Sequence, residues 1–371
     1  MSRILCFCTI VLMAACCCHL PALQTLFTTA TPVPTHTSIL PTSTSTTEPG
    51  PPQPTLEIPA KHISEVESLL TFSSIDGWIE TVKELSGEEP VTVLGNTFTI
   101  DSRYSVEMFL NETDVNAMDY LKIRIEEIVP EDWIEIDPYL FEYENHEQEW
   151  YNLIVTIPGT TKPDEEILLT AHADSATFDI EVGDSAPGAD DNASGVAALM
   201  EALKVLSQHP FERTIKLIFF SGEEQGLLGS TAYVEDHDLS NVVAVINLDV
   251  ISYDPNDDQC ADLYVGTLSE SEAIGQLMMQ VIKDYDLNLQ MEYFTDDAIN
   301  ASDHAPFWES GVGAVMLSAN LEDGKDSTCE PAEFNPNMHT TQDIFENIDP
   351  TTGYELTRLA IISAIELAGM P

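Results

Sequence analysis

Basic side chains are scarce in this sequence. Its 371 residues include 13 Lys or Arg against 64 Asp or Glu, which gives a formal net charge of −51. A polyanion of this strength repels phosphate backbones and anionic membrane surfaces, so nucleic-acid binding is excluded. The same charge attracts metal ions and cationic ligands. The hydrophobic share of 43% is ordinary for a globular protein, and the length suits one large α/β domain or two small ones.

Long apolar runs are also missing, apart from one near the N-terminus. Residues 4–15 form an apolar run of about a dozen residues, whereas a membrane span needs roughly 20. Arg3 precedes this run and small residues follow it, a pattern typical of an export signal over residues 1–18. The stretch Met13-Ala14-Ala15-Cys16 resembles a bacterial lipoprotein cleavage site. We therefore expect secretion or extracytoplasmic display on the cell surface, and leave lipid anchoring to a membrane and simple release both open.

Residues 19–56 lack the apolar and charged side chains of a folded domain. Residues 28–55 alone hold 10 Thr, 7 Pro and 3 Ser. A stretch of this composition buries too little apolar surface to fold, and it is predicted to be a disordered linker. Residues 57–371 contain no second linker and no internal repeat, so we expect a single folded domain there.

Cysteine is almost absent from that predicted domain. Five of the seven cysteines lie in residues 1–18, which leaves Cys260 and Cys329. In an oxidising compartment two cysteines are candidates for a disulfide. Two separate buried thiols are the alternative.

The pattern of apolar residues predicts strands that alternate with helices. Runs rich in β-branched and aromatic residues predict strands over residues 151–157, 166–171, 214–221, 242–249, 261–266 and 313–318. Apolar residues at helical spacing cover residues 193–208, 269–285 and 352–367, and further helical patterns lie near 63–85 and 114–128. This order predicts an α/β fold with a mostly parallel mixed sheet sandwiched between helices. Ligands of such sheets bind at the carboxyl ends of the strands.

Polar residues follow several of the predicted strands. His172 comes directly after the second strand, and Asp174 lies where a carboxylate can fix the tautomer of a metal-binding imidazole. Glu223 and Glu224 follow the third strand, and adjacent carboxylates at the end of a buried strand repel each other unless a cation lies beside them. Asp249 ends the fourth strand in the same way.

Two loops supply further candidates. Asp190 and Asp191 lie in the run Gly-Ala-Asp-Asp-Asn-Ala-Ser-Gly that leads into the helix at 193–208, where N-capping accounts for one acidic residue but not for two. His339 lies in a polar loop before the last predicted helix. Each residue has an ordinary structural explanation when it is taken alone. Together, two imidazoles and several carboxylates at one edge of a sheet suit a pair of divalent zinc ions.

In order and spacing, these motifs resemble the co-catalytic di-zinc aminopeptidases, the group of the secreted bacterial leucyl aminopeptidase and aminopeptidase Y. The resemblance covers about residues 60–371. It implies that residues 57–371 are a single catalytic domain of the zinc-exopeptidase type that holds two Zn²⁺ per chain. It implies peptides with a free N-terminus as substrates, and no obligate protein partner is expected.

The resemblance also implies a set of metal ligands. Asp191 would bridge both zinc ions. His172 and Asp249 would complete the first ion, and Glu224 and His339 would complete the second.

Two acidic residues would act without binding metal. Asp174 would orient His172, and Glu223 would be the general base. In the mechanism that the resemblance implies, Glu223 takes a proton from a water shared by the two ions, and the resulting zinc-bridging hydroxide attacks the N-terminal peptide bond. Glu223 then returns the proton to the leaving amine. A cis peptide bond at Asp191-Asn192 is implied as well.

The sequence departs from several members of that group at one position. They carry a tyrosine that binds the oxyanion shortly before a Ser-Asp-His sequence, and here Ile299 stands at that place before Ser302-Asp303-His304. Either another donor such as His304 replaces the tyrosine or the reaction is slower. We expect His304 to support the site without binding metal.

Other activities remain open at this point. The group also contains carboxypeptidases and glutaminyl cyclases, and a catalytically silent binding ectodomain is a further alternative. A carboxypeptidase needs Arg or Lys to hold a carboxylate, but the basic residues between His172 and Cys260 are Lys204, Arg213 and Lys216, none of them next to a motif. The net charge instead favours a cationic α-amine. The acidic run at residues 254–258 is either a calcium site or a solvated loop.

Overall fold

The computed structural model describes residues 63–93, 95–105, 116–143, 146–177, 185–324, 329 and 331–371. The predicted export signal at 1–18 and the predicted linker at 19–56 lie outside the described residues and stay predictions. Within the described part of the chain, no helix has the length and apolar character needed to cross a lipid bilayer.

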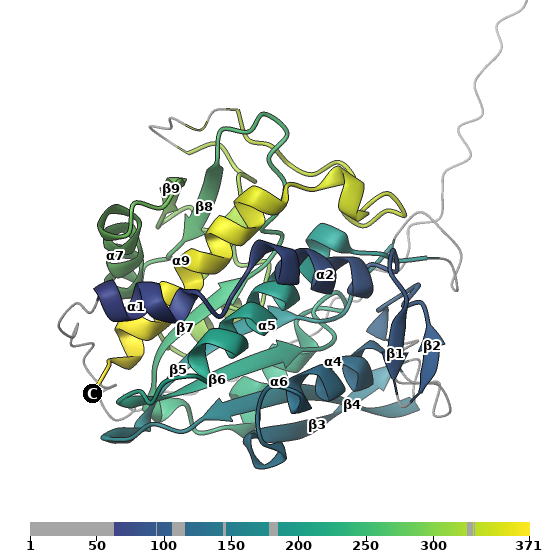
Figure 1. Cartoon of the computed structure of the whole chain (residues 1–371), viewed down its shortest axis with the longest axis horizontal. Coiled ribbons are helices and arrows are strands. Elements are labelled where there is room, and N and C mark those ends of the chain that lie inside the picture. Colours follow the sequence, from purple (N-terminus) through teal and green to yellow (C-terminus); the bar gives the residue numbers. More distant parts are fainter. Residues whose placement is uncertain are drawn as a thin grey trace, which may run out of the picture. The chain divides into compact units, whose positions relative to one another are not determined.

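The central element is an eight-stranded mixed sheet with the strand order β3-β4-β6-β5-β7-β10-β8-β9 (Figure 1). In that order the strands are β3 (Ile134–Tyr143), β4 (His146–Ile157), β6 (Arg213–Phe220), β5 (Lys162–His172), β7 (Val242–Leu248), β10 (Ala314–Ala319), β8 (Cys260–Tyr264) and β9 (Gln290–Phe294). Strands β6, β5, β7 and β10 are mutually parallel, whereas β3–β4, β4–β6 and β8–β10 pair antiparallel. The predicted mixed α/β sheet is therefore confirmed, with its parallel part at the centre.

Helices cover both faces of the sheet because successive strand residues point to opposite sides. Leu169 and Leu217 belong to the larger apolar core, which also contains residues of α1 (Ile63–Leu70), α2 (Ile75–Leu85), α4 (Ala117–Glu126), α5 (Gly195–Leu206), α7 (Ser269–Asp284) and α9 (Pro350–Ala368). Their neighbours Leu168 and Ile218 point the other way, to a smaller core that includes residues of α6 (Leu228–Asp236) and α8 (Ala305–Glu309).

The predicted elements and the observed ones differ in a few places. The pattern at 63–85 is two helices, because Ser74 leaves the helical conformation and its side chain accepts the Gly77 N–H as the N-cap of α2. The helix predicted at 193–208 begins at Gly195, after an irregular turn over Ala189–Ser194. The sequence patterns do not predict the small antiparallel sheet of β1 (Val91–Val93) and β2 (Asn96–Phe98). They also do not predict β3, β9, α6 and α8.

Candidate metal centre

Three parallel strands bring polar residues to one edge of the sheet. His172 is the last residue of β5, Glu223 and Glu224 follow the end of β6, and Asp249 comes directly after β7. Because these strands are parallel neighbours, their carboxyl ends meet at one edge. Asp191 reaches the same place from the turn before α5 and His339 from the loop before α9. The residues form two groups, His172, Glu223 and Asp249 in one and Asp191, Glu224 and His339 in the other, each with ligand atoms within 4.8 Å of one another.

Asp191 connects the two groups through its two carboxylate oxygens. Its Oδ1 lies 3.2 Å from Nε2 of His172, and its Oδ2 lies 2.9 Å from Nε2 of His339. Nε2 of His172 is also 3.1 Å from Oδ1 of Asp249, and Nε2 of His339 is 3.1 Å from Oε2 of Glu224. One aspartate therefore faces two imidazoles, each with a second carboxylate beside it.

Asp174 lies behind these groups and contacts more than the imidazole. Nδ1 of His172 is 3.2 Å from the main-chain oxygen of Asp174 and 3.5 Å from its carboxylate. The carboxylate accepts the hydroxyl of Ser105 at 2.9 Å and the backbone N–H groups of Glu223 and Glu224 at 3.3 Å. Asp174 thus holds the turn after β6 as well as His172 at the end of β5.

The turn that carries Asp191 is held by residues that the sequence patterns do not identify. The carboxylate of Asp343 accepts the N–H of Asp190 at 2.9 Å and that of Asp191 at 3.0 Å. The carboxylate of Asp190 accepts the N–H of Ser252 and the side-chain amide of Asn335, so it points away from the two histidines. The Asp191-Asn192 peptide bond is cis, as the resemblance implies.

The electrostatics of the site fit a cation. Burial, and after it the Asp191 carboxylate, raise the pKa of Glu224 to about 7. Burial also raises the pKa of Glu223 well above its usual range, with Asp249 as the strongest like charge. Burial lowers the pKa of His339, but Asp191 and Glu224 outweigh it and raise that pKa to about 10. These raised pKa values indicate an excess of buried negative charge, which a divalent cation would neutralise.

The donor set also matches zinc. Imidazole nitrogens and carboxylate oxygens are its usual ligands beside thiolates. Oε1 of Glu224 is buried and has no hydrogen-bond partner within the described part of the chain, as expected for an oxygen reserved for another ligand. The residues present therefore fit a zinc centre.

A cavity of about 500 Å³ opens beside the two groups. Its lining includes the acidic residues Glu223, Glu224 and Asp249 and the apolar residues Ile299, Met316, Leu321, Phe334 and Met338. His304 contacts one of these lining residues, since its Nε2 is 2.9 Å from the main-chain oxygen of Ile299. Burial lowers the pKa of His304 to about 4, so it is neutral.

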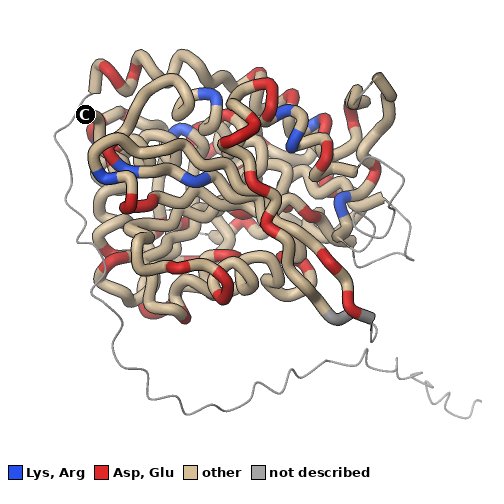
Figure 2. Tube along the Cα trace, turned by 90° about the horizontal axis from the view of Figure 1, so that it is seen from below, with Lys and Arg blue, Asp and Glu red and all other residues tan. Residues whose placement is uncertain are grey.

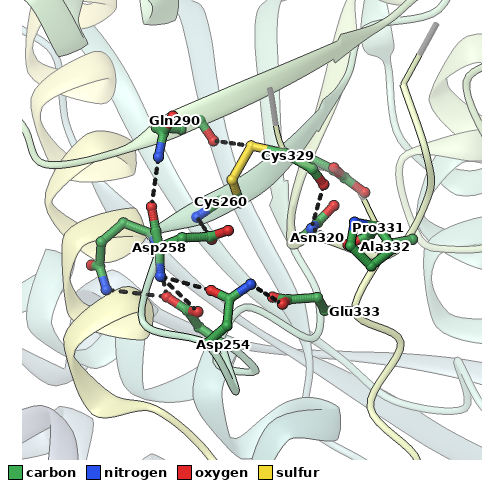
Figure 3. The surroundings of a disulfide bond; sticks show 12 residues. Asp254, Asp258, Cys260, Gln290, Asn320, Cys329, Pro331, Ala332 and Glu333 are labelled. Atoms are coloured by element: carbon green, nitrogen blue, oxygen red, sulfur yellow. Dashed lines mark hydrogen bonds between the residues drawn. A yellow bond between two sulfur atoms is a disulfide. The ribbon is translucent and has the colours of Figure 1, made fainter. Parts of the chain in front are cut away.

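The acidic run at 254–258 lies apart from the two groups, next to the disulfide that joins Cys260 and Cys329 (Figure 3). The predicted disulfide is thus present. Asp254 and Asp258 form a third cluster of carboxylates with Glu333. The oxygens of Asp254 already accept hydrogen bonds from the N–H groups of Asp258 and Gln259. These bonds account for the buried Asp254 without an ion.

A mixed α/β sheet with two adjoining His/carboxylate groups at the carboxyl ends of its parallel strands is an arrangement that suits a metal-dependent protein. Residues 152–362 match peptidase family M28, and the chain belongs to that family.

Individual relatives agree with this assignment. The chain is 28% identical over 255 residues to the probable aminopeptidase YDR415C of Saccharomyces cerevisiae. The matched region covers 64% of this chain and 62% of that protein. It is 31% identical over 195 residues to aminopeptidase YwaD of Bacillus subtilis, covering 52% of this chain and 38% of that protein. It therefore spans less than two thirds of the length of these relatives. The structure of the LapA aminopeptidase of Legionella pneumophila has the same fold, with a TM-score of 0.64, 23% identity and coverage of 88% of this chain and 80% of that one.

Proposed function

We propose that the chain is a secreted or surface-tethered zinc aminopeptidase that holds two zinc ions and hydrolyses the N-terminal peptide bond of peptides. The observation that carries this proposal is the position of Asp191, whose two oxygens face His172 and His339 in two adjoining groups of ligands. His172 and Asp249 would hold one ion, Glu224 and His339 the other, and Asp191 both. Zinc bound there supplies a Lewis acid for a peptide carbonyl and lowers the pKa of a water.

The chain's own residues would position the substrate and move the proton. Glu223 lines the cavity beside the ligands, where its carboxylate would accept a proton from water and return it to the leaving amine. The acidic residues that line the cavity would attract the free α-amine of a peptide. The apolar lining residues would contact the first side chain of the substrate, so we propose a preference for apolar N-terminal residues such as leucine.

The proposed location depends on two features. Residues 1–18 have the pattern of an export signal, and the Cys260–Cys329 disulfide suits an oxidising compartment outside the cytoplasm. Cys16 would carry a lipid if the chain is anchored. Incorporation of a labelled fatty acid that disappears in a Cys16→Ser variant, but not in Cys17→Ser, would establish lipid anchoring. Unlabelled chain recovered from the culture medium would establish release instead.

Hydrolysis of leucyl-p-nitroanilide and of its N-acetylated form tests the proposed activity. We expect cleavage of the free amine, loss of cleavage with a chelator, recovery with zinc and no cleavage of the acetylated form. Equal cleavage of both forms would contradict recognition of the amine. No cleavage after reconstitution with zinc would instead favour a silent binding domain.

Glu223→Gln tests the role of the base separately from metal binding. The amide has nearly the same shape but cannot accept and return the proton, so we expect turnover to fall at least about 100-fold. Zinc content, measured by mass spectrometry of the metal, should stay near that of the wild type. Glu235→Gln, at an exposed position of α6, is the matched control and should change neither value. Loss of zinc from Glu223→Gln would mean that Glu223 is a ligand.

A further inference from the structure

Arg103 is completely buried and joins three segments of the chain. Its Nε donates to the main-chain oxygen of Ala173 at 2.9 Å. Its Nη1 donates to Leu85 and Pro187 at 2.6 Å each, and its Nη2 donates to Gly188 at 2.8 Å. All of these acceptors are backbone carbonyls. The planar guanidinium therefore works as a fork between loops, a geometry that a single ammonium group cannot reproduce.

Two of these segments carry proposed metal ligands. Ala173 directly follows His172, and Gly188 lies three residues before Asp191. The Arg103 main chain strengthens the first contact, since its oxygen accepts the N–H of Ser175 at 3.2 Å and its N–H donates to the Ser175 hydroxyl at 3.3 Å. Arg103 thus fixes the distance between the loop after β5 and the turn before α5. Those loops bring Nε2 of His172 and Oδ1 of Asp191 to 3.2 Å.

Gly188 is closely packed between Arg103 and the turn that carries Asp191. Gly188 has a positive φ of 52°, and a Cβ there would lie 2.2 Å from the main-chain oxygen of Asp191 and 2.8 Å from Nη2 of Arg103. No larger residue fits between the arginine and the turn.

Within the part of the chain that the structure describes, Arg103 forms no ion pair. Among the described residues no carboxylate accepts a hydrogen bond from it. Burial lowers its pKa to about 10, so it keeps its proton at neutral pH, and the charges that favour the protonated form come first from Asp343 and then from Asp191. Burial of a cation costs desolvation free energy unless opposite charges or hydrogen bonds compensate for it. Here the positive charge faces the excess of negative charge at the metal centre.

We propose that Arg103 is a positioning residue of the metal centre, which sets the spacing of the His172 and Asp191 loops and offsets the repulsion among their carboxylates. The inference rests on the proposed function only in so far as the two groups bind divalent metal. Its test is therefore metal binding and not peptide hydrolysis.

Cobalt binding to the full chain can separate the effect of Arg103 on the spacing of the loops from the effect of its charge. Arg103→Lys keeps the charge but cannot reach the separate carbonyls, so we expect weaker Co²⁺ binding, about 10-fold, and an altered visible absorption spectrum. Arg103→Met removes both the charge and the fork, and we expect a loss of about 100-fold. Circular dichroism before titration identifies the variants that fold. If Arg103→Met does not fold, the affinity and spectrum of Arg103→Lys still decide the geometric part.

Arg213 offers a matched control because it is also a fully buried arginine. It donates to Glu165 at 2.6 Å and to the main-chain oxygen of Leu367 at 2.7 Å, at the start of β6 and therefore at the opposite end of that strand from the site. Arg213→Lys should lower the melting temperature and leave cobalt affinity and spectrum unchanged. Wild-type cobalt affinity and spectrum in both Arg103 variants would overturn the inference. An equal loss of cobalt affinity in Arg213→Lys would also overturn it. Failure of the wild type to bind cobalt or zinc would refute the proposed function instead.

Discussion

Two adjacent aspartates in one turn have different surroundings. Asp190 accepts hydrogen bonds from the Ser252 N–H at 2.8 Å and from Asn335 at 2.9 Å, whereas the oxygens of Asp191 face His172 and His339. Asp190 therefore holds neighbouring loops together, and Asp191 is available for metal. Since Asp191 contacts both groups, it should be the ligand on which both ions depend.

Asp191→Ala should remove both of the proposed metal ions, because its two oxygens face the histidines of both groups. Asp249→Ala is the comparison, since Asp249 belongs to one group alone, and we expect it to lose one ion and keep the other. Metal content after gel filtration in zinc-free buffer measures both. Retention of two ions by Asp191→Ala would contradict the bridging role.

Residue patterns in the sequence identify the proposed ligands but not the residues that hold them. His172, Glu224 and Asp249 stand out because they lie at or shortly after the ends of apolar strands of the sheet. Arg103 and Asp343 instead contact backbone groups of Ala173 and Asp190, which lie 70 and 153 residues away from them and carry no sequence signal. Such contacts become visible only when the fold is known.

At the scale of elements, buried strands are predicted better than exposed ones. All residues of β7 are buried, and its predicted range of 242–249 agrees with the structure within one residue. The edge strand β3 is not predicted, because Pro138 interrupts the short alternation of Ile134 and Ile136 with Glu135 and Asp137. Pro138 is tolerated there because β3 is an edge strand, where Ile136 and Leu140 are 48% and 63% exposed.

The disulfide supports the segment that carries one wall of the cavity. Cys329 precedes Phe334 and Met338, which line the cavity, and its partner Cys260 begins β8. We expect the double variant Cys260→Ser/Cys329→Ser to lose up to about 4 kcal/mol of stability, since the disulfide spans 69 residues. It should raise KM for leucyl substrates more than it lowers kcat. Loss of zinc with unchanged KM would place the effect of the disulfide at the metal centre instead.

A buried carboxylate supports the same wall and predicts a pH effect. Asp262 accepts the N–H of Leu321 at 2.8 Å and that of Glu322 at 3.1 Å, and burial raises its pKa to about 7. The folded state keeps this proton up to about pH 7, whereas an unfolded aspartate loses it near pH 4. The folded state therefore binds more protons in this window, and the free energy of unfolding falls as the pH rises.

Asp262→Asn should remove this pH dependence, because the amide stays neutral and its oxygen can still accept the same N–H groups. Relative to the wild type, the variant should gain up to about 4 kcal/mol of unfolding free energy between pH 4 and pH 8. Urea unfolding at several pH values measures it. Asp236→Asn, at an exposed position of α6, is the control. Parallel pH profiles for wild type and Asp262→Asn would contradict the argument.

At the scale of the whole molecule, acidic residues far outnumber basic ones. Figure 2 shows acidic residues throughout the view, with few basic residues among them. Several basic side chains are engaged in ion pairs, for example Lys162 with Glu212 and Lys216 with Glu166. The sequence alone gives the net charge of −51 but not its distribution. Compact packing of this charge costs free energy that the expanded unfolded chain largely avoids.

Added salt should therefore stabilise the folded chain. The screening length falls from roughly 20 Å at 0.02 M salt to about 4 Å at 0.5 M, so repulsion between surface carboxylates weakens over this range. We expect the melting temperature to rise by several degrees in scanning calorimetry with a chelator present, which removes any contribution from divalent ions. Sodium chloride and potassium chloride should give equal shifts at equal ionic strength, because screening does not depend on the identity of the ion. A melting temperature that stays constant or falls would show that the ion pairs outweigh the repulsion between like charges.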